Sequence, residues 1–321
     1  MAFPTVSVII PVRNEAKRIR QCIEGILKQT VPVHEIIVID SGSTDGTLDI
    51  LAEFPQIDLI EIDGSTFNHG LTRNLGVERA TGEFCQLTVG DAYAYNEFWL
   101  EEMLKGFVDD EVMAVCGQQV VDHLPENNPL QWFRPVDLIS RMKRIQFTNE
   151  AWSKLSNQER RDASRWDDVN AMYKRSALIA MPFEKTGYSE DLIWANNALE
   201  QGWAICQNHN SRVYHFHYET KEFRFKRTLT SLYFIYKLHD VLPREPSVWS
   251  LKYKSVLFLR LLKLTFNPIQ AMKWLHYNID CHRGYSEAIL VAKSALEIGE
   301  DELDRQHQFQ CSKPPIPPKR T

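Results

Sequence analysis

Two hydrophobic periodicities alternate along the first half of the chain, and this alternation limits the folds that it can adopt. Short apolar runs bounded by Pro, Asp or Gly are typical of buried strands, and apolar residues three and four positions apart are typical of helices. Strands that alternate with helices predict an α/β fold with a mostly parallel, Rossmann-like sheet flanked by helices. The expected strands are 6–10, 35–40, 57–62, 84–91 and 112–120, and the expected helices are 15–27, a segment from 47 towards 54, and 68–80.

Two of the expected strands end in an aspartate. Asp40 closes the second strand, and Asp91 ends the apolar run that begins at Phe84. Ligands of open α/β sheets bind beside the carboxyl ends of the strands, so we expect both aspartates to face one crevice, together with Asn14 and Glu15 after the first strand. The alternative for Asp91 is a helix or turn cap, a position that suits Asp.

The turn Ser41–Thr47 is rich in Ser and Gly. Free backbone N–H groups at such a helix start would suit an anionic or nucleotide ligand, although the same residues fit a plain strand-to-helix cap. The turn is neither a G-x-G-x-x-G fingerprint nor a P-loop, so the sequence does not favour a nicotinamide or ATP site.

Composition excludes several classes of protein. The net charge of −5 gives no general attraction to nucleic acid. The six cysteines are scattered without C-x-x-C spacing, which indicates reduced thiols rather than a zinc or redox site. Neither a secretory signal nor an apolar run of spanning length is evident, so we expect a cytoplasmic protein.

Glu190 and Asp191 form a second acidic signal. Ser189 before them can cap a helix, and two acids in a first turn stabilise a helix by about 0.3 to 1 kcal/mol each through its dipole. A purely structural role is therefore one interpretation of this pair.

Two histidines alternate along the extended segment 211–217. His215 and His217 should face the same side, which makes a plausible metal edge, whereas the alternative is two half-exposed side chains. A zinc hydrolase would need a third N, S or O ligand in register, and the sequence shows none.

Four blocks carry a resemblance to a known family. VSVIIPVRNEAKRIRQCIEGILKQ, EIIVIDSGSTDGT, FNHGLTRNLGVERATGEF and LTVGDAYAYNEFWLEEM occur in this order. They resemble the successive blocks of a family 2 glycosyltransferase with the glycosyltransferase A-type fold, and the Asn-His-Gly-x-Thr-Arg-Asn segment is most similar to the bacterial rhamnosyltransferase-like branch. The resemblance covers residues 4 to about 217.

The resemblance implies roles for particular residues. Asp191 would be the catalytic base, with Glu190 orienting it or a neighbouring cation. Asp40 would contact the base or ribose of a sugar nucleotide, and Arg73 would lie near its diphosphate. The expected residues of the nucleotide-sugar site are Pro11, Arg13, Glu15, Asp40, Ser41, Ser43, Asn68, Arg73, Asp91 and Asn170, and the expected metal ligands are Asp91, His215 and His217.

The metal motif departs from the wider family. Most members carry Asp-x-Asp, whereas this chain has Val89-Gly90-Asp91, as is typical of the rhamnosyltransferase-like branch. Mg²⁺ or Mn²⁺ prefers several hard oxygen ligands. The diphosphate and a histidine would supply ligands in place of the missing first carboxylate, and His215 is the preferred histidine.

The resemblance also suggests a domain organisation. We expect a catalytic domain over 1–218, with a nucleotide-sugar half (1–122) and an acceptor half (123–218), then a basic helical extension (219–300) and a mobile tail (301–321). Residues 125–165 are interpreted either as a solvated helical excursion or as a lid that binds the acceptor.

The extension differs from the rest of the chain in charge. Between Glu219 and Arg283 twelve cations oppose five acids, and Leu257, Leu261 and Leu264 fall on one helical face. Such a segment can lie in a bilayer interface. The alternative is a helical hairpin packed on the catalytic domain or on a second subunit.

Together these observations predict an inverting glycosyltransferase that transfers a rhamnose-like sugar from a nucleoside diphosphate sugar to a glycan or a polyprenyl-linked acceptor in surface polysaccharide synthesis. We expect it in the cytoplasm or on the inner face of the cytoplasmic membrane, with a divalent cation and with homo-oligomers left open. The alternatives are a polyprenyl-phosphate sugar transferase of the same fold and a non-catalytic nucleotide-sugar binding module.

Overall fold

The computed structural model describes residues 4–132, 142–244 and 246–311. The chain forms two compact units. Unit 1 comprises residues 1–120 and 135–215, and unit 2 comprises 121–134 and 216–321. The division falls three residues before the expected boundary at 218, and unit 2 includes 121–134, which we had expected in the acceptor half of the catalytic domain.

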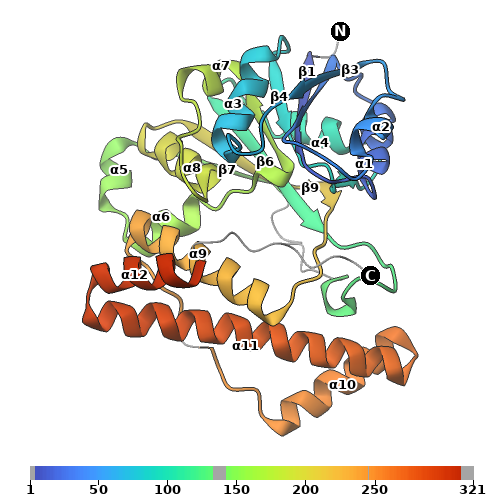
Figure 1. Ribbon diagram of the computed structural model, residues 1–321. Coiled ribbons are helices and arrows are strands. Elements are labelled where there is room, and N and C mark those ends of the chain that lie inside the picture. Colours follow the sequence, from blue (N-terminus) through green and yellow to red (C-terminus); the bar gives the residue numbers. More distant parts are fainter. Residues whose placement is uncertain (1–3, 133–141, 245, 312–321) are drawn as a thin grey trace. The chain divides into compact units, whose positions relative to one another are not determined.

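One mixed sheet forms the centre of unit 1 (Figure 1). Its strands run in the order β3-β2-β1-β4-β8-β6-β9-β5, and β7 pairs with β9. The pairs among β3, β2, β1 and β4 are parallel, as predicted, whereas β8 pairs antiparallel with both β4 and β6. The strands are β1 Val6–Val12, β2 Glu35–Asp40, β3 Ile57–Glu61, β4 Phe84–Leu87, β5 Tyr93–Ala94, β6 Val112–Val120, β7 Met142–Ile145, β8 Ala171–Lys174 and β9 Ala204–Tyr214.

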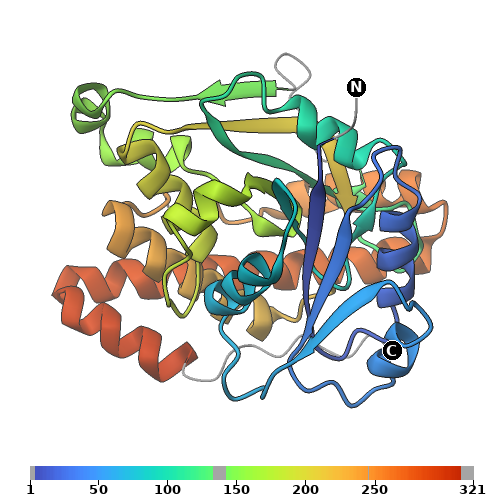
Figure 2. The same ribbon diagram turned by 90° about the horizontal axis from the view of Figure 1, so that it is seen from above.

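Helices cover both faces of the sheet because the central strands are apolar on both sides. Val8 and Ile10 of β1 belong to one hydrophobic core, and Ile9 between them belongs to the other. Residues of α1 and α4 pack in the first core, and residues of α3, α7 and α8 pack in the second. Figure 2 shows α1 and α3 on opposite sides of the strands. The helices of unit 1 are α1 Ile19–Leu27, α2 Thr47–Leu51, α3 His69–Arg79, α4 Trp99–Lys105, α5 Asn149–Lys154, α6 Asn157–Ala163, α7 Arg175–Ala180 and α8 Glu190–Glu200, with a 3-10 turn, η2, at Asp168–Asn170.

The predicted α/β fold is confirmed, and the differences are local. β1 continues through Pro11 to Val12, whereas its pairing with β4 ends at Ile9, so the missing N–H of Pro11 breaks no bond on that side. β4 ends at Leu87, and Asp91 lies in the turn that follows rather than on the strand. Residues 125–165 were expected to lack strands, but Met142–Ile145 form β7 on the edge of β9.

Unit 2 is helical and has two hydrophobic cores. Leu257 and Leu261, predicted on one helical face, are buried in the first core with Trp274. Residues 301–311, expected in a mobile tail, lie in helix α12, and residues 312–321 lie outside the described part. No helix of the described residues is long and apolar enough to cross a membrane. The elements are η1 Pro129–Gln131, α9 Lys221–His239, α10 Leu251–Thr265, α11 Pro268–Ile298 and α12 Glu300–Cys311.

A glycine sets how closely α3 approaches the sheet. A Cβ atom added at Gly76 would lie 2.4 Å from Cγ2 of Ile9 and 3.0 Å from Cδ1 of Ile39, both in the second core. Only a residue without a side chain fits at this distance, so Gly76 fixes α3 on β1 and with it the position of Arg73.

We expect Gly76→Ala to lower the free energy of unfolding by about 1–3 kcal/mol, because the added methyl forces Ile9 or the helix to move. Gly25→Ala is the matched control, since Gly25 is also helical but its Cβ would meet no atom closer than 3.5 Å. There alanine should leave stability unchanged or raise it by up to about 1 kcal/mol through helix propensity. Chemical denaturation of both variants measures this, and equal stabilities would contradict the role of Gly76.

Candidate functional site

Asp40 organises the turn at the end of β2. It is buried, and its Oδ2 accepts hydrogen bonds from the backbone N–H groups of Gly42 and Ser43, both at 2.9 Å. The Ser43 hydroxyl donates to Oδ1 of the same carboxylate. Ser41 is buried as well, and its hydroxyl donates to the carbonyl of Val12 at 3.2 Å. Asp40 and Ser41 therefore fix the loop in which the sequence predicts a nucleotide.

The loop after β1 is bonded to this turn. Asn14, in the left-handed region with a φ of 59°, donates its N–H to the hydroxyl of Ser43 at 2.8 Å and accepts from the N–H of Thr44 at 2.8 Å. The N–H of Glu15 donates to Oγ1 of Thr47 at 2.8 Å. Arg13 is exposed at the start of the loop. The structure thus places Asp40 and Ser43 in contact, and it bonds the backbone of Asn14 and Glu15 to the same turn.

The turn that carries Asp91 joins the same edge of the sheet. A Cβ atom at Gly90 would lie 2.9 Å from Cγ1 of Val12 and 3.1 Å from Cγ of Glu15. The missing side chain at Gly90 lets the turn after β4 approach the loop after β1. Glu15 therefore lies beside the residue that precedes Asp91.

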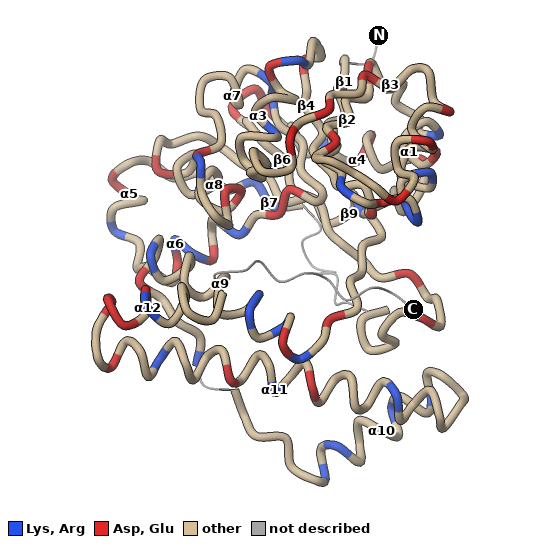
Figure 3. Tube along the Cα trace, viewed as in Figure 1, with Lys and Arg blue, Asp and Glu red and all other residues tan. Residues whose placement is uncertain are grey.

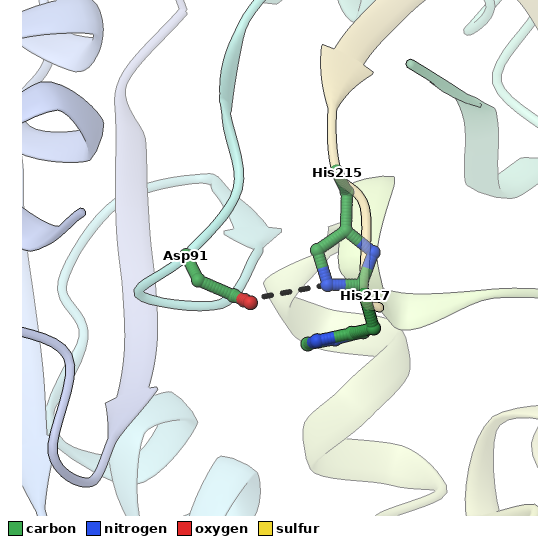
Figure 4. A group of neighbouring side chains, drawn as sticks. All are labelled: Asp91, His215 and His217. Atoms are coloured by element: carbon green, nitrogen blue, oxygen red, sulfur yellow. Dashed lines mark ion pairs between the residues drawn. The ribbon is translucent and has the colours of Figure 1, made fainter. Parts of the chain in front are cut away.

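Asp91 lies beside His215, a residue that is distant from it in the sequence. Oδ1 of Asp91 lies 3.3 Å from Nε2 of His215, which directly follows β9, and both side chains are largely buried, with 14% and 10% of their area exposed. His217 follows two residues later, and the potential ligand atoms of the three residues all lie within 4.8 Å of one another. Figure 4 shows both imidazole rings next to the Asp91 carboxylate. One carboxylate and two imidazoles could hold a divalent cation.

Gln119 determines which nitrogen of His215 carries a proton. Its amide N–H donates to Oδ2 of Asp167, and an ionised carboxylate only accepts, so the Gln119 oxygen must face the histidine. That oxygen lies 2.7 Å from Nδ1 of His215. Nδ1 therefore carries a hydrogen that it donates to Gln119, and Nε2 is the ring nitrogen that faces Asp91.

A second cluster surrounds the buried guanidinium of Arg73 on α3. Arg73 is 4% exposed, and its Nη1 donates to Oε1 of Glu190 and lies 3.6 Å from Oδ2 of Asp168. Asp168 also accepts from the hydroxyl of Tyr173 at 2.5 Å, and its N–H donates to Oδ2 of Asp191 at 3.4 Å. Two carboxylates thus pair with one cation, and the Asp168 N–H holds the carboxylate of Asp191 beside them.

Burial and mutual repulsion shift the acids of this cluster. Burial, and then the charges of Asp168, Glu190 and Asp167, raise the pKa of the Asp191 carboxyl well above its ordinary value. Burial also raises the pKa of Asp168 to about 7, although the Arg73 guanidinium opposes that shift. A carboxylate that binds a proton more strongly than usual is suited to act as a general base near neutral pH.

The turn η2 connects the two clusters. Asp167, immediately before it, bonds Gln119, and Asp168, its first residue, bonds Tyr173 and pairs with Arg73. The path from Asp91 through His215 and Gln119 therefore continues into the Arg73 cluster by two consecutive residues. Asp91 and Asp191, exactly one hundred positions apart in the sequence, belong to a single network of hydrogen bonds and ion pairs.

Three of the predicted donor contacts have other partners in the structure. Arg73 was expected near a diphosphate but is enclosed by Glu190 and Asp168. Asn68 caps α3, since its Oδ1 accepts from the N–H of Leu71 at 3.1 Å. Asn170 is buried, and its amide bonds the indole of Trp99 at 2.7 Å and the carbonyl of Ser211 at 3.2 Å. These three side chains position the elements around the site.

Sequence reasoning missed Gln119, Asp167, Asp168 and Tyr173. The available signals were the Gln118-Gln119 pair at the end of a strand and the acidic pair Asp167-Asp168 just before another strand. Neither pair has a characteristic spacing, because the partners come from strands that are distant in sequence.

Comparisons with known proteins agree with this architecture. Residues 7–183 match the model of the family "Glycosyl transferase family 2". The O-antigen chain rhamnosyltransferase WbaN of Salmonella anatum is 31% identical over 233 residues, which cover 70% of this chain and 70% of the relative. The O-antigen chain rhamnosyltransferase RfbN of Salmonella typhimurium is 27% identical over 227 residues, with 69% of each chain covered.

Solved structures share the fold at low sequence identity. The mannosyltransferase PcManGT from Pyrobaculum calidifontis, in complex with GDP-Man and Mn²⁺, superposes with a TM-score of 0.55 and 19% identity over 96% of this chain and 84% of its own. S. aureus TarS 1-349 superposes with a TM-score of 0.54 and 15% identity over 95% and 79%. These similarities support a glycosyltransferase A-type fold.

We expect Arg73→Met to lower the free energy of unfolding by about 3–5 kcal/mol, because it leaves buried carboxylates without their cation. The loss should be larger at pH 8 than at pH 5, since raised carboxyl pKa values mean that ionisation then destabilises the folded state. Arg79→Met is the matched control on the same helix, because the ion pair of Arg79 with Asp58 is exposed. Denaturant titrations at both pH values test this, and similar losses in the two variants would contradict it.

Proposed function

The chain belongs to glycosyl transferase family 2 and is a glycosyltransferase, and we propose that it transfers a rhamnose-like sugar from a nucleoside diphosphate sugar to a hydroxyl group, with inversion. The rhamnosyltransferase relatives support the choice of sugar. The observation that carries the proposal is the network in unit 1 that links the Asp91–His215 pair to Asp191 through Gln119 and the two acids at η2.

Asp191 is the proposed catalytic base. An acceptor hydroxyl becomes acidic as its oxygen attacks the anomeric carbon, and the Asp191 carboxylate would accept that proton. Its raised pKa gives it a greater proton affinity than an exposed aspartate has. Glu190 is proposed to orient this end of the site through its ion pair with Arg73. Direct attack with no covalent sugar–enzyme intermediate gives inversion.

The proposed donor site lies at the other end of the network. Asp40, Ser41, Ser43 and Glu15 form the loops that would hold the nucleoside, with Arg13 exposed beside them. Asp91 and His215, with His217, fit a divalent cation because a carboxylate oxygen and two imidazole nitrogens lie within 4.8 Å of one another. Such an ion, Mg²⁺ or Mn²⁺, would screen the charge of the leaving nucleoside diphosphate.

The proposed acceptor is a glycan or a glycan carried on a polyprenyl lipid, in bacterial surface polysaccharide synthesis. A lipid-linked acceptor lies at a membrane surface, so we propose that the enzyme works on the inner face of the cytoplasmic membrane. Nucleoside diphosphate release with a panel of sugar nucleotides and acceptors tests the proposal. Transfer to a bare polyprenyl phosphate would favour a polyprenyl-phosphate sugar transferase, and donor binding without turnover would favour a binding module.

We expect Asp191→Asn to reduce sugar transfer at least about 100-fold, the lower bound for the loss of a general base, and to spare donor binding. In the native enzyme kcat/KM should rise with pH through an apparent pKa above about 4, the ordinary value for Asp, because only the ionised base accepts a proton. Kinetics from pH 4.5 to 8.5 and calorimetry with the nucleoside diphosphate measure both. Asp162→Asn, at an exposed ion pair with Arg165, is the control. Near-native turnover of the Asp191 variant would make the assignment wrong.

We expect Gln119→Leu to weaken Mn²⁺ binding about 10- to 100-fold, the usual effect of removing the hydrogen-bond partner of a metal-bound histidine. Gln118→Leu, one residue earlier on β6, is the matched control because successive side chains of a strand point to opposite faces of the sheet. Titrating Mn²⁺ in the presence of nucleoside diphosphate, with free ion followed by electron paramagnetic resonance, gives the affinity without turnover. Equal affinities in the two variants would contradict the orienting role, and no Mn²⁺ binding by the native protein would contradict the metal site.

A further inference from the structure

The connection between α10 and α11 in unit 2 exposes two large apolar side chains. Phe266 is 89% exposed and Ile269 is 80% exposed, with only Asn267 and Pro268 between them (Figure 1). Phe266 is in the left-handed region with a φ of 50°, which is unfavourable for a bulky residue and is usually left to Gly or Asn at a helix end. Folding of unit 2 alone does not explain an aromatic ring at this position.

The exposed apolar surface extends from this turn along α10. Among the described residues, ten large hydrophobic side chains are more than half exposed, and six of them lie within residues 248–269. We call these six the α10–α11 surface. They are Val248, Leu251, Val256, Leu259, Phe266 and Ile269, with exposed fractions between 58% and 93%.

The opposite side of α10 anchors it in the protein. Leu257 and Leu261 are buried in the first core of unit 2 with Ala271 and Trp274 of α11. At 100° per residue, Leu259 lies on the side of α10 away from Leu257 and Leu261. The helix therefore has one apolar side in the core and further apolar side chains exposed.

Charge indicates what covers this surface. Residues 246–279 contain five cations and no acid, although the whole chain has a net charge of −5. Figure 3 shows Lys and Arg but no acidic residue along α10. A symmetric contact between two copies would bring ten cations together without a counter-charge from the same segment. An anionic lipid surface supplies that counter-charge and accepts the apolar side chains.

We propose that the α10–α11 surface binds the interface of an anionic phospholipid bilayer, with Phe266 and Ile269 inserted among the acyl chains. Long lysine side chains such as Lys252 and Lys263 reach the headgroups while their stems lie on the apolar surface. This inference rests on the proposed membrane-borne acceptor, because a bilayer contact would hold the enzyme beside such a substrate. The contact itself needs no sugar transfer.

Flotation of the full-length protein with vesicles tests the proposal. We expect binding to phosphatidylcholine vesicles that contain 30% phosphatidylglycerol and weak binding to vesicles of phosphatidylcholine alone. The difference is expected because the negative surface potential of an anionic leaflet attracts the cations beside the α10–α11 surface. Phe266→Ser with Ile269→Ser should reduce binding at least about tenfold. Lys252→Gln with Lys263→Gln should reduce it roughly fivefold for each cation removed and should make it less sensitive to salt.

Ile298→Ser with Phe309→Ser is the matched control, since these side chains are 78% and 74% exposed elsewhere in unit 2. Native binding by the Phe266 and Ile269 double variant, or no binding by the native protein, would overturn the proposal. Sedimentation without lipid tests the alternative that a second copy of the chain covers the surface. A native protein that is a dimer and a variant that is a monomer would favour that alternative and overturn the proposal. Transfer to a water-soluble acceptor should persist in the variant, so failure of the membrane contact and failure of the enzymatic function are distinguishable.

Discussion

The site depends on the ion pairs of the buried Arg73 guanidinium with Glu190 and Asp168. The guanidinium neutralises part of the charge of Glu190 and Asp168, and it is held at this depth because Gly76 lets α3 lie directly on β1. Three carboxylates around one cation leave an excess of negative charge. Burial, together with that excess, raises the pKa of Asp191 and distinguishes it from an ordinary helix-capping acid.

The network gives the two ends of the proposed reaction a common support. Asp167 orients the histidine end through Gln119, whereas Asp168 contacts the cation and the tyrosine of the other end. The two aspartates are consecutive, so one short turn contacts both ends of the site. Positioning of a leaving group and of an attacking oxygen relative to one another is where much of the rate enhancement of such enzymes arises. In the proposed reaction, η2 would supply that positioning.

The sequence predicted the parts of the fold that depend on local pattern. β2 and β6 have the predicted bounds, because the apolar runs 36–39 and 112–116 within them have few other interpretations. β7 and the antiparallel β8 depend on pairing with distant strands, which no local pattern encodes. The same limit applies to the site: the sequence identified Asp91, His215 and Asp191 as candidates, but it could not show that Arg73 pairs with carboxylates rather than with a ligand, because spacing does not reveal which anion a buried cation meets.

The irregular pairing of β6 with β9 has a consequence for variation in this protein. Cys116 pairs with Gln207 and Gln118 with Arg212, so β9 has three more residues than β6 over this stretch. Side chains alternate between the faces of a sheet, and an odd number of additional residues reverses which of them point to a given face. The length of segment 208–211 therefore decides on which face His215 emerges. The bulge is also fixed in place, because the buried side chains of Asn208 and Ser211 donate hydrogen bonds to the carbonyls of Glu102 and Trp99. A single deletion there would turn the imidazole away from Asp91 although every residue of the site would still be present in the sequence.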